Sequence, residues 1–189
     1  MIKEGKVNLF LISGRAGSGK DTAAKFIANT IRYINFNDDS SLTFRKYKFA
    51  AVVKEVAHLI GWNGQKTVSG RRLLQNIGDA GRDYNSYTWA LKVRDEILSI
   101  PFPVNVAVIS DWRYLNEAEM FVSDPIFNVV TLRISGRNEA MLSSLAEHSS
   151  ETSLTDEMEY DFVVDNSGSL DEFEKAIANI VLGRIDAKV

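Results

Sequence analysis

A short apolar run followed at once by a glycine-rich loop constrains this chain more than any other feature of its sequence. Residues Val7–Ser13 form the apolar run, and apolar side chains return at helical spacing from Asp21 to Ile34. The loop between them reads Gly14-Arg15-Ala16-Gly17-Ser18-Gly19-Lys20-Asp21-Thr22. Its glycines permit a tight turn in which backbone N–H groups point inward. A strand, this loop and a helix in that order predict a P-loop, which binds the phosphates of a nucleotide.

The residue after the loop lysine departs from the usual P-loop pattern. That position normally carries a Ser or Thr whose hydroxyl binds Mg²⁺, but here it is Asp21, and Thr22 follows. Mg²⁺ accepts either kind of oxygen, directly or through water. We therefore expect Mg²⁺ to be used, and the sequence leaves open which oxygen holds it.

Length and composition indicate one domain with mobile insertions. The chain has 189 residues, of which 45% are hydrophobic and 25% charged, enough for one full core and too few for two large domains. The absence of cysteine excludes a disulfide framework, a thiolate metal site and a cysteine nucleophile. The N-terminal apolar run is too short for a signal peptide or a membrane span. We therefore expect a soluble, cytoplasmic protein.

Charge is unevenly distributed along the chain. The net charge of −3 argues against a surface built to bind a nucleic-acid polymer. Residues 44–94 hold ten basic side chains against three acidic ones, whereas residues 139–174 hold eleven acids and no Lys or Arg. Solvated helix faces would explain either stretch. Because the basic stretch follows a P-loop, it is a candidate site for a second phosphorylated molecule.

Strand and helix patterns alternate along the sequence. We expect strands at 7–12, 47–49, 104–109, 129–134 and 162–164, and helices at 21–34, 50–60, 71–79, 87–98, 138–147 and from 170 onward. Ser169 and Glu172 have the spacing of a capping box at the start of the last helix. Alternation of this kind is typical of an α/β fold with a central, mostly parallel sheet and helices on both faces.

Ligands in such folds bind at the carboxyl ends of the strands. Three segments fall there: the P-loop, Asp111–Arg113 after the central strand, and Asp165–Gly168 after the last strand. We expect all three to line one cleft.

Several later segments, taken with the P-loop, resemble one enzyme family. They are Phe49-Ala50 with Lys54-Glu55, Arg72-Leu73-Leu74-Gln75 with Gly78, Arg82 and Trp89, Ser110-Asp111-Trp112-Arg113-Tyr114 with Asn116-Glu117-Ala118-Glu119, and His148-Ser149-Ser150-Glu151. In this order, and with the Gly-Lys-Asp-Thr ending of the P-loop, they are similar to the deoxynucleoside monophosphate kinases of tailed bacteriophages. That family is a branch of the P-loop nucleoside monophosphate kinases. The similarity runs from the first strand to the last helix.

The resemblance implies a kinase that uses Mg²⁺ and moves the γ-phosphoryl group of ATP onto a deoxynucleoside 5′-monophosphate. If the protein is encoded by a phage, it would act in the cytoplasm of the host. The resemblance also implies a three-layer P-loop NTPase fold with a five-stranded sheet. The core would cover about 1–43, 100–134 and 152–189, a helical acceptor-binding insert about 44–99, and a small lid about 135–151. Phosphoryl transfer depends on positioning and positive charge, so it needs no catalytic triad, and none is visible.

The P-loop is the expected donor side of the site. ATP is expected to contact Gly14, Arg15, Ala16, Gly17, Ser18, Gly19, Lys20, Asp21, Thr22 and Asn166. Asn166 resembles an asparagine that lies near adenine in related kinases, although a simple turn explains it equally well. The metal candidates are Asp21, Thr22 and Asp111.

The acceptor side is expected on the basic stretch and the strand ends. Its candidates are Lys54, Arg72, Gln75, Arg82, Trp89, Asp111, Trp112, Arg113 and Glu151. A guanidinium matches phosphate oxygens in a fork geometry, so the arginines are the expected clamps. The tryptophans could stack on the base, and core packing is their alternative role.

Catalysis is expected to depend on Lys20, Arg82, Asp111, Arg113 and Arg137. Arg137 belongs to the predicted lid, which would close over the phosphates and exclude water. Structural salt bridges are the alternative for the arginines, and a pair with Arg113 is the alternative for Asp111.

Two other functions stay open at the level of sequence. The chain could phosphorylate a different small acceptor, as dephospho-coenzyme A kinase and the animal-type phosphomevalonate kinase do. It could also be a nucleotide-dependent switch or ATPase. The expected partner is a small molecule rather than a nucleic-acid polymer or a membrane. The base preference and the oligomeric state stay open, although members of the family often form homodimers through acceptor-side helices.

Overall fold

The computed structural model describes residues 6–100, 104–136, 154 and 159–185. Its strands are β1 (Val7–Ser13), β2 (Phe44–Tyr47), β3 (Val106–Ile109), β4 (Phe127–Ser135) and β5 (Phe162–Asp165). Its helices are α1 (Lys20–Asn37), α2 (Phe49–Leu59), α3 (Val68–Tyr84), α4 (Thr88–Leu98), α5 (Leu115–Ser123) and α8 (Leu170–Arg184). The predicted capping box at Ser169 and Glu172 is present at the start of α8.

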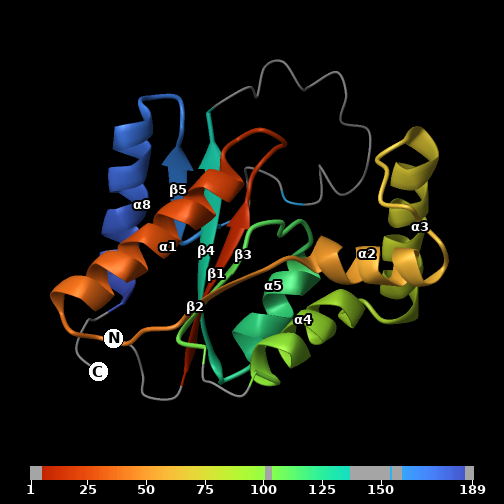
Figure 1. Ribbon diagram of the computed structural model, residues 1–189, viewed down its shortest axis with the longest axis horizontal. Coiled ribbons are helices and arrows are strands. Elements are labelled where there is room, and N and C mark those ends of the chain that lie inside the picture. The colour runs from red at the N-terminus through yellow and green to blue at the C-terminus, as the bar shows by residue number, and fades with distance from the viewer. Residues whose placement is uncertain (1–5, 101–103, 137–153, 155–158, 186–189) are drawn as a thin grey trace.

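The five strands form one parallel sheet in the order β2-β3-β1-β4-β5 (Figure 1). β1 lies in the middle, is hydrogen-bonded to β3 and β4, and has every residue buried. A strand covered on both faces has a continuous apolar sequence, as β1 does. The predicted α/β fold with a five-stranded sheet is confirmed, and all the described strands are parallel.

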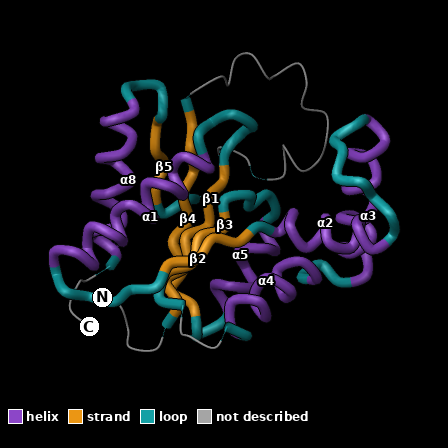
Figure 2. Tube along the Cα trace, in the orientation of Figure 1, coloured by secondary structure: helices purple, strands orange, loops and turns teal. Residues whose placement is uncertain are grey.

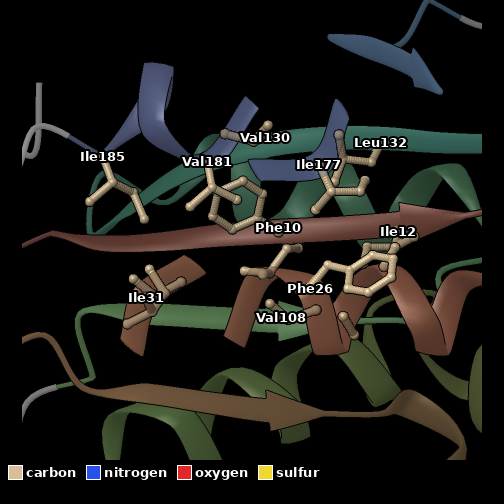
Figure 3. Packing of buried hydrophobic residues seen from close by; sticks show 14 of the residues in the cluster. Phe10, Ile12, Phe26, Ile31, Val108, Val130, Leu132, Ile177, Val181 and Ile185 are labelled. Carbon is tan, nitrogen blue, oxygen red and sulfur yellow. The ribbon is translucent and has the colours of Figure 1, made fainter. Parts of the chain in front are cut away.

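Helices cover both faces of the sheet and give the fold three layers (Figure 2). Successive residues of a strand face opposite sides, so Phe10 and Ile12 pack with α1 and α8 (Figure 3), whereas Leu9 and Leu11 pack with α2, α4 and α5. Burial of each such side chain stabilises the fold by roughly 1.5–3 kcal/mol. The two cores thereby hold the carboxyl end of β1, where the P-loop begins, in a fixed place.

The boundary between β2 and α2 differs from the prediction. A strand was expected at 47–49, but β2 covers Phe44–Tyr47 and Phe49 already begins α2. The cause is a contact from outside the segment: the carboxylate of Asp111 accepts hydrogen bonds from the N–H groups of Phe49 and Ala50. These bonds satisfy the first donors of the helix, which the local sequence leaves uncapped.

The structure also contains a helix that was not predicted, α5, with nine residues. It is too short for apolar periodicity to reveal it. Its start is stabilised instead by Glu117, whose carboxylate accepts the N–H of Tyr114. The helix predicted at 138–147 lies outside the described residues.

Beyond β2, the chain leaves the sheet as α2 and α3 and returns through α4 (Figure 1). Within the predicted insert of residues 44–99, β2 belongs to the central sheet and the remainder is largely helical. The division into core, insert and lid stays a prediction, and residues 137–151 of the lid lie outside the described residues. In the described parts of the chain, no helix combines the length and apolar character needed to span a bilayer.

Candidate functional site

The loop between β1 and α1 has the backbone that a phosphate-binding turn requires. Gly14, Gly17 and Gly19 adopt φ values of +149°, +75° and +107°, which other residues rarely adopt. Lys20 follows as the first residue of α1, and its ammonium donates to the carbonyl oxygens of Gly14 at 2.5 Å and Arg15 at 2.7 Å. The lysine therefore lies against the same loop whose N–H groups are predicted to hold phosphates.

Asn166, which follows the edge strand β5, supports the P-loop through hydrogen bonds. Its side-chain amide donates to the carbonyl oxygen of Ser18 at 2.8 Å, and its backbone N–H donates to Ser135 at 2.9 Å. A Cβ added to Gly19 would collide with this amide. Asn166 is 4% exposed, so it acts here as a buried support for the loop. Its predicted contact with ATP stays a prediction.

Asp21, in the usual Ser/Thr position, is held by three donors that lie in β2 or directly follow β2 and β3. Its Oδ1 lies 2.8 Å from the Nζ of Lys46 and 3.1 Å from the Nζ of Lys48. It also accepts a hydrogen bond from the hydroxyl of Ser110 at 3.1 Å. The hydrogen bond from Lys46, reinforced by Lys48, holds the pKa of Asp21 well below its usual range. The next residue, Thr22, is half-buried.

Asp111, at the end of β3, binds the start of α2. Its Oδ1 accepts the N–H of Phe49 at 3.0 Å and its Oδ2 accepts the N–H of Ala50 at 2.9 Å. Burial raises the pKa of this carboxyl, although the two hydrogen bonds act in the opposite direction. The structure thus gives Asp111 a capping role, and its metal and catalytic roles stay predictions.

Glu117 is a buried carboxyl that sets the backbone next to the predicted acceptor site. It is 4% exposed, and its Oε2 accepts the N–H groups of Arg113 at 3.0 Å and Tyr114 at 3.1 Å. Burial raises its pKa to about 8, and the negative charge of Asp111 adds to this shift. Glu117 therefore fixes the chain at Arg113, a predicted phosphate ligand.

Arg82 of α3 comes close to this same turn. Its guanidinium lies 4.1 Å from the centre of the Tyr114 ring, a cation–π contact, and 2.6 Å from the carboxylate of Asp79. Tyr114 directly follows Arg113 in the chain. Arg82 and Arg113, both predicted to bind the acceptor, therefore lie near the same turn, although 31 positions separate them in the sequence.

A small cleft opens beside the P-loop at the carboxyl ends of β1, β3 and β4. Its wall is made of Ser13, Gly14, Arg15, Trp112, Arg113, Arg133 and Leu154. Arg133 is 6% exposed and its Nη1 donates to the hydroxyl of Ser13 at 3.3 Å. Arg113 and Arg133 therefore share the cleft with Arg15 of the P-loop, and three arginines make the cleft suitable for anions.

The remaining predicted residues are dispersed. Trp89 and Trp112 are buried in the core, where their ring N–H groups donate to Gly78 and Tyr114. Lys54 is half-buried on α2, and Arg72 and Gln75 are exposed on α3. Within the described residues, the cleft wall includes Trp112 but not Lys54, Arg72, Gln75 or Trp89. Arg137, His148 and Glu151 lie outside the described residues.

No individual role was predicted for Ser110, Lys46, Lys48 or Glu117, although both lysines belong to the basic stretch of residues 44–94. Two signals point to the contacts of the lysines and of Glu117. Lys46 and Lys48 are two residues apart on an extended segment, so they share a face. Glu117 occupies the third position of its helix, where an acidic side chain commonly reaches back to the helix start.

Comparisons with known proteins show a similarity of fold and no similarity to a known family. The chain matches no protein-family model and no curated protein. A solved structure from Chloroflexus aurantiacus, described as a candidate kinase, aligns with 96% of this chain and 97% of its own, at 13% identity and a TM-score of 0.51. A gluconokinase from Sinorhizobium meliloti aligns with 96% of this chain and 94% of its own, at 18% identity, but its TM-score of 0.47 is too low to support a conclusion.

At 13% identity the first likeness bears on the fold alone. Together with the parallel five-stranded sheet and its strand order, it shows that this chain shares the α/β fold of that structure.

Proposed function

We propose that this chain is an ATP-dependent kinase whose acceptor is a deoxynucleoside 5′-monophosphate. The observation that carries the proposal is the cleft in which Gly14 and Arg15 of the P-loop face Arg113 and Arg133. A kinase of a phosphorylated acceptor must hold two phosphate groups side by side, and positive groups on both walls suit that task. The deoxynucleotide as acceptor is supported by the sequence resemblance.

The P-loop is the proposed donor side. Backbone N–H groups of Gly14–Gly19 and the ammonium of Lys20 would hold the outer phosphates of ATP. In the free protein this ammonium binds the carbonyl oxygens of Gly14 and Arg15. Phosphate oxygens are stronger partners because both groups are then charged. We therefore expect Lys20 to exchange these carbonyl oxygens for phosphate oxygens when ATP binds.

Arg113 and Arg82 are the proposed acceptor clamps. Arg113 lines the cleft, and Arg82 packs on Tyr114 beside it. Arg82 is bound to the carboxylate of Asp79 in the free protein. A phosphate monoester carries more negative charge than a carboxylate and has three oxygens for a guanidinium to bind, so it can compete with Asp79.

The proposed reaction moves one phosphoryl group. The bond between the γ-phosphorus and its bridging oxygen breaks, and the electron pair leaves with ADP. An oxygen of the acceptor phosphate forms the new bond to the γ-phosphorus and gives the diphosphate. This oxygen carries no proton at neutral pH, because the second pKa of a phosphate monoester is about 6, so no general base is needed. Lys20 and the arginines supply alignment and positive charge.

Oxygen atoms at the start of α1 fit a hard divalent cation. The Asp21 carboxylate is exposed, and the Thr22 hydroxyl follows it. Mg²⁺ bound with ATP would neutralise phosphate charge and order the phosphate oxygens. Asp111 is the weaker candidate because both of its oxygens already accept backbone hydrogen bonds.

A coupled assay with Mg·ATP tests the proposal. Separate reactions would contain dAMP, dCMP, dGMP, dTMP, 5-hydroxymethyl-dCMP, AMP or dephospho-coenzyme A, with products identified by chromatography. We expect diphosphate from at least one deoxynucleotide. Phosphorylation of dephospho-coenzyme A alone would keep the kinase and replace its acceptor. ATP hydrolysis that no acceptor affects would contradict the kinase and favour a nucleotide-dependent switch.

A further inference from the structure

A hydrogen bond joins the end of β3 to the start of α1. The hydroxyl of Ser110 donates to Oδ1 of Asp21 at 3.1 Å, and Ser110 is 2% exposed. β3 is the direct neighbour of β1 in the sheet, so Ser110 lies beside the strand that leads into the P-loop. The bond therefore links two segments, the loop and a neighbouring strand end, that both supply metal ligands in P-loop enzymes.

In such enzymes the two groups usually occupy the opposite places. The loop supplies a Ser or Thr hydroxyl after its lysine, and a neighbouring strand supplies an aspartate. Here the loop supplies the carboxylate of Asp21 and the strand supplies the hydroxyl of Ser110. The next residue, Asp111, is engaged by the start of α2 instead. This chain therefore has the same pair of a hydroxyl and a carboxylate, but the loop carries the carboxylate and the strand end carries the hydroxyl.

Two lysines of the neighbouring β2 region hold the same oxygen of Asp21. The Nζ atoms of Lys46 and Lys48 lie 2.8 and 3.1 Å from Oδ1. Together with the Ser110 hydroxyl, every contact that the structure gives this carboxylate within the described residues falls on Oδ1. The Asp21 side chain is still 64% exposed, so Oδ2 is the oxygen that can bind a cation.

We infer that Ser110, aided by Lys46 and Lys48, is a positioning residue that orients the Asp21 carboxylate so that its Oδ2 binds the divalent cation accompanying the nucleotide. This role rests on the proposed function, because it requires a nucleotide in the P-loop. Ser110 acts only through Asp21. Groups that orient a metal ligand typically account for 10–100-fold in metal affinity. Loss of the Ser110 hydroxyl should therefore weaken metal binding and leave metal-free nucleotide binding intact.

The test measures two affinities of the full chain. Electron paramagnetic resonance of free Mn²⁺ gives the Mn²⁺ affinity of the ADP-saturated protein, and calorimetry in EDTA gives the ADP affinity without metal. The variants are Ser110→Ala, Asp21→Asn and the two combined. Ser123→Ala is the matched control, because the Ser123 hydroxyl also donates one hydrogen bond, to the carbonyl oxygen of Met120 in α5.

We expect Ser110→Ala to weaken Mn²⁺ binding by about 10–100-fold with unchanged ADP affinity in EDTA. The double variant should bind Mn²⁺ as weakly as Asp21→Asn alone, since the two changes remove one interaction. Ser123→Ala should match the wild type in both measurements.

Three results would overturn the inference. Wild-type Mn²⁺ affinity in Ser110→Ala would remove the positioning role, and so would effects of Ser110→Ala and Asp21→Asn that multiply in the double variant. A loss of metal-free ADP affinity in Ser110→Ala would make the serine a structural residue of the loop. In each of these cases the wild type still binds ADP and the proposed function stands. Failure of the wild type to bind ADP would overturn the proposed function together with the inference.

Discussion

The two walls of the cleft are built in opposite ways. The P-loop residues of the wall, Gly14 and Arg15, belong to one continuous segment, Gly14–Thr22, whose shape follows largely from its own glycines. The facing wall collects Arg113 from the turn after β3 and Arg133 from β4, with Arg82 of α3 close by. A local loop needs few outside contacts to reach its shape, whereas an assembled wall depends on every element that carries a part of it. Function should therefore respond differently to changes in the two walls.

Substitution of Lys20 should have the largest effect. Its ammonium is the one side-chain cation that the P-loop pattern assigns to the transferred phosphates. We expect Lys20→Ala to lower kcat for diphosphate formation by about a hundredfold to a thousandfold, the usual loss when a group that stabilises the transition state is removed. The coupled assay measures this, and circular dichroism should report an unchanged fold.

The matched control is Lys25→Ala, which removes an exposed lysine from the same helix. Its activity should equal that of the wild type. Full activity in Lys20→Ala would show that the loop does not serve phosphoryl transfer.

Substitution of Arg82 should affect the acceptor and spare ATP. Loss of a charged hydrogen bond to the acceptor phosphate weakens binding by about 1.5–3 kcal/mol of free energy. Arg82→Ala should therefore lower kcat/KM for the deoxynucleotide about tenfold to a hundredfold, while the KM for ATP stays unchanged. Arg71→Ala, on the exposed side of the same helix, should change neither constant. A change confined to the KM for ATP would place Arg82 on the donor side instead.

Glu117 should make the stability of the assembled wall depend on pH. Burial raises its pKa from the ordinary value of 4.5 to about 8, so between these values the folded state binds more protons than the unfolded state. The stabilisation by protonated Glu117 is complete below about pH 4.5 and is lost as the pH rises through about 8. Glu117→Gln keeps an acceptor oxygen for the backbone N–H groups but does not titrate.

Thermal unfolding of the wild type and Glu117→Gln at pH 5, 6, 7 and 8 measures this difference. The melting temperature of the wild type should fall relative to that of the variant as the pH rises. Parallel pH profiles would mean that Glu117 does not titrate in this range. Glu119→Gln, an exposed acid on the same helix, is the control and should follow the wild type.

The smallest effect is expected at Asn166, the long-range support of the P-loop wall. Asn166→Ala removes the hydrogen bond to the carbonyl of Ser18 and should lower the free energy of unfolding by about 1 kcal/mol. Because the carbonyl stays in place and the loop can relax, ATP affinity should fall only slightly. Urea unfolding measures the first effect, with the exposed Asn29→Ala as control. A large loss of ATP affinity at unchanged stability would instead favour direct contact with the nucleotide.

The predictions failed at β2 and α5, where a carboxylate sets the start of a helix. Apolar periodicity predicted β1, α1, α4 and α8 closely, because a central strand and long amphipathic helices carry their pattern within their own residues. It misplaced β2 because Asp111 starts α2 at Phe49, and it missed α5 because Glu117 stabilises a helix too short to show a period. In both places a carboxylate binds backbone N–H groups, across 62 positions at α2 and across three at α5.

Local patterns in the sequence were sufficient for the fold class and for the glycine-rich turn between β1 and α1. A glycine that needs positive φ, or a strand buried on both faces, requires particular residue types at particular positions in any chain of this kind. Only the tertiary structure decided that Asp21 meets Lys46 and Ser110, which lie 25 and 89 positions away. Neither local propensity nor periodicity records which distant side chains the sheet order brings together, so the partners of Asp21 emerge only when β2, β3 and β1 lie side by side.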